Sequence, residues 1–316
     1  ERLKLIFLSK NKTEQPPSQL RSRFADLLKA DTIDFSDFDG FQDIAEDLLY
    51  TFMIMPNLKN LIIKKVPLSW PALAKFISTN TTLRYLETHQ EIKKDFNQFA
   101  ESYASNNNIQ LRSLNFSDSK FGPEMMDGLK MILEKNKLTQ LTIKNELTEL
   151  GYKQLLPLLI NCSGFQTVTH FDLSGCKKAV PESILLQLTN LTTLNLNSCL
   201  LDICILLTDL NRSRSLPLAE ISVCENFCSE NLDPSFLLSK SLKSFHADNV
   251  VWRGNSLQSF FTIVSQTKDL REVNLSLQGV QLNDWQTFDS FLQNTSNNNI
   301  VSLDFSNNPI YSGFCT

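Results

Sequence analysis

The chain has 316 residues, of which 42% are hydrophobic and 20% are charged, and its formal net charge at pH 7 is −4. The hydrophobic content is ample for a core, whereas the slight acidic excess does not supply the basic face that nucleic-acid phosphates usually require. No run approaches the roughly 18–20 consecutive apolar residues of a membrane-spanning helix. We therefore expect a chain that binds no nucleic acid and does not insert directly into a membrane.

A short phrase, with apolar residues at its first, fourth and sixth positions, recurs along the whole chain. Leu191, Leu194 and Leu196 form a clear copy. The twelve copies begin at residues 3, 30, 58, 83, 111, 138, 168, 191, 218, 242, 270 and 300, in steps of 23 to 30 residues. A period of this length indicates a stack of supersecondary units.

Each copy of the phrase predicts a β-strand. The fourth and sixth positions share one side of an extended chain, and the fifth position points to the other side. From the second copy onward, the fifth position is polar in ten of the eleven repeats. These strands are therefore expected to be buried on one face and solvent-exposed on the other.

Helical patterns follow many of the strands. In chain order they cover residues 70–77, 123–133, 155–160, 256–264 and 285–292. Pro71 and Pro123 suit the first turn of a helix, whereas Pro157 is expected to bend the third helix or to mark its first turn. The two shortest repeats, which begin at residues 168 and 218, have room only for a short helix or a 3₁₀ turn.

No repeat can bury its apolar face alone, so the repeats are expected to stack around one continuous core. Length alone would favour two domains, but the repeat favours a single solenoid over residues 1–316, in which 1–29 form a first repeat or a modified N-terminal cap. Because a strand begins at residue 3 and no C-terminal polar cap is evident, we expect a fragment of a longer protein. A nearly complete protein is the alternative.

This pattern resembles the leucine-rich repeat family, whose phrase continues to Asn or Cys at position 9. That position holds Cys176, Cys199, Asn226 and Asn308 in four repeats. Elsewhere it departs to Phe38, Val66, Glu91, Ser119, Glu146, Val250 and Gln278. The period and the helical second halves resemble the ribonuclease-inhibitor-like subclass, which includes RanGAP and the actin regulators of the CARMIL and tropomodulin groups. The resemblance implies an α/β horseshoe of about 12 repeats, with parallel strands on the concave face and helices on the convex face.

The resemblance also implies a function, although a fold alone does not determine an activity. The first expectation is a non-enzymatic scaffold that binds a protein partner through its concave face. A CARMIL-like regulator of the actin cytoskeleton is the alternative, and a RanGAP-like regulator of small GTPases is a second one.

The concave-face residues expected to contact a partner come from many strands. They are Glu87, Asn115, His170, Asp172, Asn195, Glu220, His246, Asp248, Glu272 and Asp304. Among positions 3, 5 and 7 of the phrase from residue 30 onward, seven residues are acidic and only Lys64 and Lys144 are basic. This excess favours a partner with a basic surface, and the alternative is scattered charge that only solvates the protein.

Catalytic and cofactor chemistry find little support in the sequence. His170, Asp172 and Ser174 share one face of a strand, but a triad also needs an oxyanion site and a dry cleft. Cys224 and Cys228 lie too far apart for a Cys-x-x-Cys zinc knuckle, and no glycine-rich phosphate loop occurs. We therefore expect no catalytic, cofactor-binding or metal-binding residues.

The seven cysteines and one tryptophan carry weaker expectations. An odd number of cysteines, several at repeat-structural positions, favours a reduced, cytoplasmic protein. A secreted effector is the alternative. Trp252 is expected either to pack at a helix start or to serve as an exposed anchor for a partner.

Overall fold

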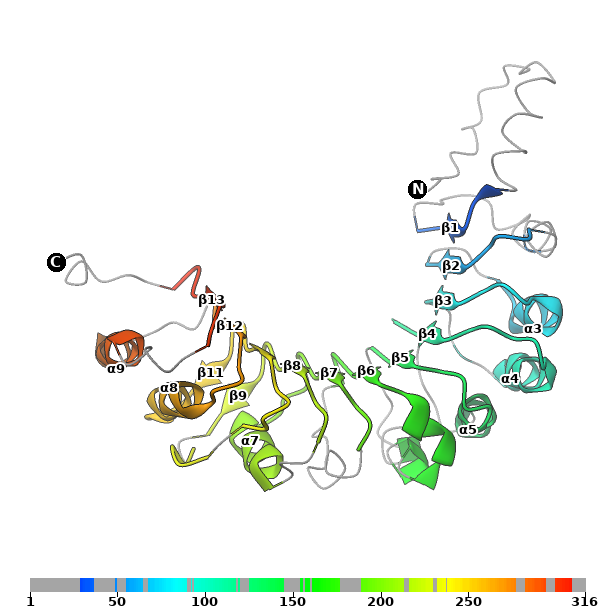
Figure 1. The fold of residues 1–316 in the computed structure, drawn as a ribbon. Helices are drawn as coiled ribbons and strands as arrows, with labels where there is room; N and C mark the ends of the chain where they lie inside the picture. The colour runs from blue at the N-terminus through cyan, green and yellow to red at the C-terminus, as the bar shows by residue number, and fades with distance from the viewer. Residues whose placement is uncertain are drawn as a thin grey trace, which may run out of the picture. The chain divides into compact units, whose positions relative to one another are not determined.

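The computed structural model describes a stack of repeated strand and helix elements (Figure 1). It describes residues 29–36, 49, 55–64, 68–89, 92, 94–117, 119, 125–144, 154–155, 157–159, 161–176, 189–212, 216–229, 232–236, 238–276, 282–293 and 299–308. The chain contains two compact units, residues 1–167 and residues 168–316, called here the N-terminal half and the C-terminal half.

In the N-terminal half, five strands pair in chain order and in parallel. They are β1 Thr32–Asp34, β2 Asn60–Ile63, β3 Tyr85–Thr88, β4 Ser113–Asn115 and β5 Gln140–Thr142. The register aligns the fourth position of each phrase, so that Ile33, Leu61, Leu86, Leu114 and Leu141 form one buried row. The strands therefore form where the phrase predicts them.

In the C-terminal half, six strands follow the same rule. They are β6 His170–Asp172, β7 Thr193–Asn195, β8 Glu220–Ser222, β10 Ser244–His246, β12 Glu272–Asn274 and β13 Ser302–Asp304. Each pairs in parallel with the next strand in this order. The weaker first copy of the phrase, at residues 3–8, lies outside the described residues.

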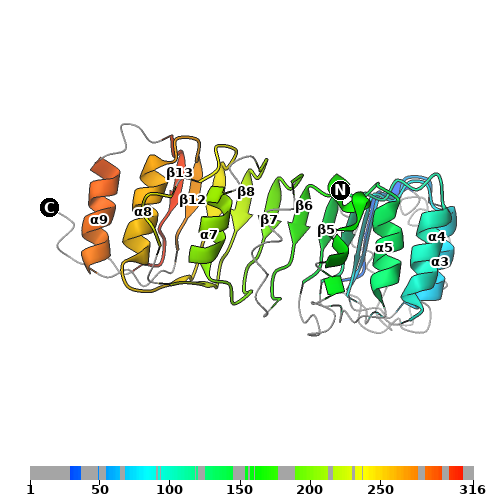
Figure 2. The ribbon, with the colours of Figure 1, turned by 90° about the horizontal axis from the view of Figure 1, so that it is seen from below.

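Helices cover one face of the sheet in each half (Figures 1 and 2). The N-terminal half contains α3 Trp70–Thr79, α4 Phe96–Ser105, α5 Met126–Glu134 and the 3₁₀ helix η3 Ser163–Thr167. The C-terminal half contains α7 Ile203–Arg212, α8 Ser256–Gln266 and α9 Leu282–Gln293. The first of these, α3, begins as its sequence predicts, because the Ser69 hydroxyl accepts a hydrogen bond from the Ala72 amide at 3.2 Å and Pro71 lies in its first turn.

One repeat departs from the expected short helix. In the 24-residue repeat that begins at residue 218, the described residues after the strand contain β9 Phe227–Cys228 and turns. The β9 strand pairs in parallel with β11 Val251–Trp252 of the next repeat. A strand advances about 3.3 Å per residue and a helix about 1.5 Å, so an extended segment crosses the repeat with fewer residues. In the other short repeat, residues 177–188 lie outside the described part.

The core of each half lies between the sheet and the helices. In the N-terminal half, Trp70, Phe96, Phe99 and Phe116 form an aromatic cluster with ring centroids 4.9 to 5.9 Å apart. In the C-terminal half, Phe261 and Phe288 lie 5.3 Å apart, and Phe288 stacks on Phe305 at 4.4 Å. Aromatic pairs at such distances add about 0.5–1.5 kcal/mol each beyond the area that they bury.

Position 9 of the phrase forms the hydrogen-bonded ladder that the resemblance implied. The Asn226 amide donates to the carbonyls of Leu196 and Val223, and its oxygen accepts from the amides of Cys199 and Leu201. Asn308 donates in the same way to the Leu275 carbonyl. Ser119, at a site that departs from Asn or Cys, is also buried and donates to the Thr88 carbonyl. The ladder therefore tolerates a hydroxyl where the sequence pattern alone indicated a break.

Candidate binding surface on the open face of the sheet

We call the sheet face opposite the helices the open face (Figure 1). Along the strands position 4 is buried, so positions 3 and 5 point to the open face, and position 7 shares their side of the extended chain. The ten residues expected to contact a partner all lie at these positions, and all fall within the described residues. They differ in what their side chains contact, and these contacts separate structural groups from groups that can bind a partner.

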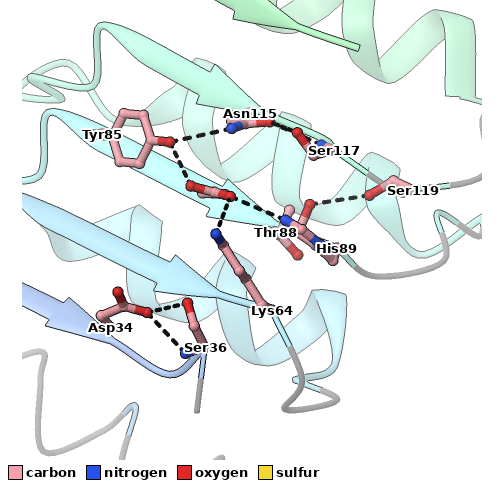
Figure 3. A network of polar contacts seen from close by, with 10 residues as sticks. Asp34, Ser36, Lys64, Tyr85, Thr88, His89, Asn115, Ser117 and Ser119 are labelled. Atoms are coloured by element: carbon pink, nitrogen blue, oxygen red, sulfur yellow. Dashed lines mark hydrogen bonds and ion pairs between the residues drawn. The ribbon is translucent and has the colours of Figure 1, made fainter. Parts of the chain in front are cut away.

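In the N-terminal half, Tyr85, His89 and Lys64 belong to a polar network on the open face (Figure 3). Glu87 joins these three side chains and is the centre of the network. Its carboxylate accepts a hydrogen bond from the Tyr85 hydroxyl at 2.6 Å and lies 3.2 Å from the Lys64 ammonium and 3.1 Å from His89 Nε2. Asn115 extends the network by donating to the Tyr85 hydroxyl at 3.2 Å. Only 8% of Glu87 is exposed, so this residue is a buried, paired acid and not a free contact group.

The environment of Glu87 explains its charge state. Burial by itself raises the pKa of a carboxyl group, but hydrogen bonds from Tyr85, His89 and Lys64, together with the lysine charge, outweigh it here. The pKa of Glu87 is therefore held below its ordinary value of 4.5. The carboxylate stays ionised at neutral pH and holds Tyr85 and His89 of its own repeat and Lys64 of the preceding repeat.

A second feature, which we call the strand-end turn, recurs at the end of most strands. An Asp or Asn at position 5 accepts a hydrogen bond from the backbone amide of position 7, which is usually serine. The pairs are Asp34–Ser36, Asn115–Ser117, Asp172–Ser174, Asn195–Asn197, Asn274–Ser276 and Asp304–Ser306. Such local bonds compete with the sheet ladder and end the strand.

The strand-end turn changes the interpretation of several predicted contact residues. Asn115, Asp172, Asn195 and Asp304 each use one side-chain oxygen to terminate a strand. Sequence reasoning missed this role, although the signal was present as an Asp/Asn–apolar–Ser pattern in five repeats. These residues shape the open face before they can contact anything else.

Asp248 also has a structural role. Its carboxylate accepts from Asn274 Nδ2 at 3.0 Å and from the Ser276 hydroxyl at 2.6 Å, both from the next repeat. The Cys224 thiol of the preceding repeat lies 3.5 Å away. Asp248 therefore connects the ends of three consecutive strands.

Four of the ten predicted contact residues belong neither to a strand-end turn nor to the contacts of Glu87 and Asp248, namely Glu220, Glu272, His170 and His246. Both glutamates and His170 are exposed, and His246 is half-buried. Glu220 Oε1 lies 3.9 Å from His246 Nε2, and Glu272 accepts a hydrogen bond from the Ser244 hydroxyl at 3.1 Å. Pairs of this kind at the surface are weak and are easily exchanged for a partner's groups.

The two halves differ in the charge of their open faces. In the C-terminal half, positions 3, 5 and 7 include five acidic residues and no lysine or arginine: Asp172, Glu220, Asp248, Glu272 and Asp304. In the N-terminal half the same positions include Asp34 and Glu87 but also Lys64 and Lys144. The acidic excess expected from the sequence is therefore concentrated in the C-terminal half.

The triad considered from the sequence does not form. The Ser174 hydroxyl bonds to Asp172 Oδ1 at 2.6 Å and to Asn195 Oδ1 at 2.7 Å, while His170 Nδ1 contacts the Thr169 hydroxyl at 2.8 Å. Among the described residues, Ser174 thus has no hydrogen bond to His170, and a general base must make that contact.

The described part of the chain bears on three remaining expectations, which concern metal binding, membrane insertion and Trp252. It contains no group of three or more His, Cys, Asp or Glu side chains placed to hold a metal ion. Within the same residues, no helix combines the length and hydrophobicity needed to cross a membrane. Trp252 is half-buried, with its ring 5.1 Å from that of Phe260, which favours packing at the start of α8 over a fully exposed anchor.

Comparisons with known proteins identify the fold. No family model and no curated protein matches the sequence. Among solved structures, an internalin (inlF) from Listeria monocytogenes superposes with a TM-score of 0.50 at 15% identity, covering 90% of this chain and 77% of that one. The fold is a leucine-rich repeat solenoid.

Other leucine-rich repeat structures match more loosely. The TLR13–ssRNA13 complex gives a TM-score of 0.48 at 17% identity, over 90% of this chain and 40% of that one. The mouse RP105/MD-1 complex gives 0.48 at 14% identity, over 79% and 43%. At such identities the likeness concerns the fold only, and the function has to be argued from the surface of this leucine-rich repeat chain itself.

Proposed function

We propose that this leucine-rich repeat chain is a non-enzymatic scaffold that binds a protein partner through the open face of its C-terminal half. The observation that carries the proposal is the set of five acidic side chains, without lysine or arginine, on six adjacent strands. A partner with a basic surface suits this arrangement, because complementary potentials speed association and exclude partners of like charge.

The rigidity of the surface supports the same proposal. Strand-end turns and the contacts of Asp248 hold most polar groups of the open face before a partner arrives. Binding then immobilises few further side chains, and the loss of conformational entropy is small. Glu220 and Glu272 are exposed and remain the principal contact groups that we assign.

The same charge argues against a nucleic-acid ligand, and we propose that none binds the open face. Phosphate contacts need lysine or arginine, and positions 3, 5 and 7 of the C-terminal half contain neither. We expect no shift of a labelled 13-nucleotide single-stranded RNA in a gel mobility assay at about 0.1 M salt, at which surface charges act over roughly 10 Å. A salt-sensitive shift would contradict this part of the proposal.

The experiment that tests the proposal is affinity capture from a cell extract with a charge-reversed open face. Glu220→Lys/Glu272→Lys reverses two exposed carboxylates that do not take part in strand-end turns. Glu101→Lys/Glu134→Lys is the matched control, because it changes the net charge equally at exposed positions on α4 and α5. We expect a basic partner that binds the wild type and the control and is lost from the open-face variant.

Retention of every captured partner by the Glu220→Lys/Glu272→Lys variant would overturn the proposal. The captured complex should also weaken as salt is raised, because exposed charge pairs are screened. Quantitative binding at 50 and 500 mM NaCl measures this dependence.

A further inference from the structure

A second surface of the C-terminal half lies at position 10 of the phrase, just beyond the ladder residue. Three consecutive repeats place a large apolar side chain there, namely Leu200, Phe227 and Val251. We call these three residues the apolar row. Leu200 and Val251 are each 59% exposed, whereas the leucines of the phrase itself are buried. Because the row contributes little to the core, its side chains are available to another molecule.

The paired strands β9 and β11 hold the row in place on the helix side of the sheet (Figure 1). Phe227 and Val251 are register partners, and the Phe227 amide donates to the Leu201 carbonyl at 3.2 Å. Alternation along the strands buries Cys228 and turns Phe227 and Val251 outward. The row is therefore fixed by backbone hydrogen bonds across three repeats.

Leu200 is unusual among these residues. Its φ is +54°, in the left-handed region that leucine rarely adopts. Among the described residues of this half, the other positive φ values belong to Gly254 and to position 8 of the phrase, where Gly175, Ser198, Glu225, Asn249 and Asn307 form the turn. At position 10, glycine or asparagine would satisfy the backbone without strain. An exposed leucine in this conformation therefore has no evident use within the fold.

A cation completes the surface. The Arg253 guanidinium lies 5.3 Å from the centroid of the Phe227 ring, and Arg253 is exposed. In the described part of the chain, no carboxylate forms an ion pair with it. Aromatic and arginine side chains in apolar surroundings are typical of the energetic centres of protein interfaces. Arg253, which has no carboxylate partner among the described residues, lies beside the apolar row and complements a carboxylate that is flanked by apolar side chains.

We propose that the apolar row and Arg253 form a second binding site, distinct from the open face, for an extended segment of a partner protein that carries aliphatic side chains next to an Asp or Glu. The aliphatic groups contact Leu200 and Val251, and the carboxylate pairs with Arg253. This ligand has the opposite charge preference from that of the open face, so the two sites can be tested separately.

The test uses a random dodecapeptide library displayed on phage and selected against the immobilised chain. Selected peptides should be rich in Leu, Ile, Val or Phe together with Asp or Glu. Leu200→Gly and Arg253→Glu should each weaken the binding of the synthesised peptides by about tenfold or more, as loss of an interface centre does. Because glycine accepts the +54° φ, Leu200→Gly should keep the thermal stability of the wild type and removes only the side chain.

Two control variants should bind the peptides as the wild type does. Val301→Thr alters an apolar residue that is 77% exposed and lies outside the row. Lys268→Glu reverses an exposed charge in the turn after α8. The Glu220→Lys/Glu272→Lys variant should also retain the peptides, which separates a failure of this site from a failure of the open face.

Three results would overturn the proposal. The first is a selection that yields no peptide sensitive to Leu200→Gly or Arg253→Glu. The second is a set of basic peptides that are lost with the Glu220→Lys/Glu272→Lys variant. The third is a concentration-dependent dimer in analytical ultracentrifugation that Leu200→Gly abolishes, because the occupant would then be a second copy of this chain.

Discussion

The environment of Glu87 differs from the one that its position in the repeat predicts. The sequence predicts a solvent-exposed carboxylate at position 5, whereas the structure buries this carboxylate and pairs it with Lys64, His89 and Tyr85. Tyr85 and His89 lie two residues before and after Glu87, whereas Lys64 directly follows the neighbouring strand β2. The Lys64 contact appears only in the tertiary structure, because Lys64 and Glu87 belong to different repeats.

Glu87→Gln should lower the free energy of unfolding at pH 7 by about 1–3 kcal/mol, because it removes a charge that accepts three charged or polar contacts. The folded-state pKa of Glu87 lies below 4.5, so its stabilisation is present above that value and is lost as the pH falls below it. Urea denaturation at pH 7 and pH 3 measures both effects. Glu220→Gln, at an exposed site, should change stability by less than about 0.5 kcal/mol; an equal loss in both variants would contradict the role of Glu87.

The cysteines give a second prediction at this scale. All six described cysteines are free, and only Cys224 is half-buried. Burial raises the pKa of Cys176 to about 12, of Cys199 to about 11 and of Cys228 to about 12, from an ordinary value of 9.0. These thiols stay protonated and unreactive in the folded state at pH 8, because the thiolate is the reactive form.

In a Cys224→Ser/Cys315→Ser variant, the five remaining thiols should react with Ellman's reagent only after urea is added. Rapid reaction of any of them in the native state would contradict their burial. Because the folded-state pKa values of Cys176 and Cys228 are raised to about 12, the contribution of these two thiols to stability is complete below pH 9 and is lost as the pH rises towards 12.

At the scale of elements, a regular helical spacing of apolar residues predicted the position of a helix. The pattern at residues 256–264 predicted α8, which spans Ser256–Gln266. The sequence reading did not single out α4 or α7, whose segments lack an early proline. An Asp precedes each helix, but only one of the two caps its helix. The Asp202 carboxylate accepts a hydrogen bond from the Cys204 amide at 3.0 Å at the start of α7, whereas the Asp95 side chain makes no capping hydrogen bond to α4. Packing against the sheet, more than local propensity, stabilises such helices.

The short 3₁₀ helix η3 supplies a prediction at this scale. A Cβ atom added at Gly164 would lie 1.8 Å from the Leu133 carbonyl oxygen at the end of α5. Gly164→Ala must therefore shift backbone, and we expect it to cost about 2–4 kcal/mol and to lower the thermal midpoint clearly.

Gly128→Ala is the informative comparison for Gly164→Ala. Its added Cβ would meet side-chain atoms of Asn97 and Phe96 at 2.6 and 2.9 Å, not backbone. Side chains can move aside more easily, so we expect a smaller loss than at Gly164. Calorimetry measures the loss of stability in both variants. A loss in Gly164→Ala that is equal to or smaller than that in Gly128→Ala would show that η3 can move away from α5.

At the scale of the whole molecule, a repeat protein is stabilised by contacts between neighbouring repeats. Asn226 is central to such contacts. Its side-chain oxygen accepts from two amides of the preceding repeat, and its amide group donates to one carbonyl of the preceding repeat and two of its own repeat. We expect Asn226→Ala to raise amide hydrogen exchange most in β7, β8 and β10 and least in β13, as measured by mass spectrometry. Asn255→Ala, at an exposed site, should leave exchange unchanged.

A uniform rise of exchange across the C-terminal half in the Asn226→Ala variant would contradict this nearest-neighbour view. It would mean that the half opens as one cooperative unit, and that a partner bound to the open face stabilises all of its strands together.

The sequence by itself determined where the strands lie and which side chains enter the core. The spacing of apolar residues at positions 1, 4 and 6 suffices for this, because the geometry of an extended chain alternates with a period of two. The tertiary structure decided what the polar positions do. The strand-end turn of Asp172 is still a local contact, because its partner Ser174 lies two residues away. The pairing of Glu87 with Lys64 and the contacts of Asp248 instead depend on side chains from neighbouring repeats. Those contacts join residues far apart in the chain, and no local pattern specifies them.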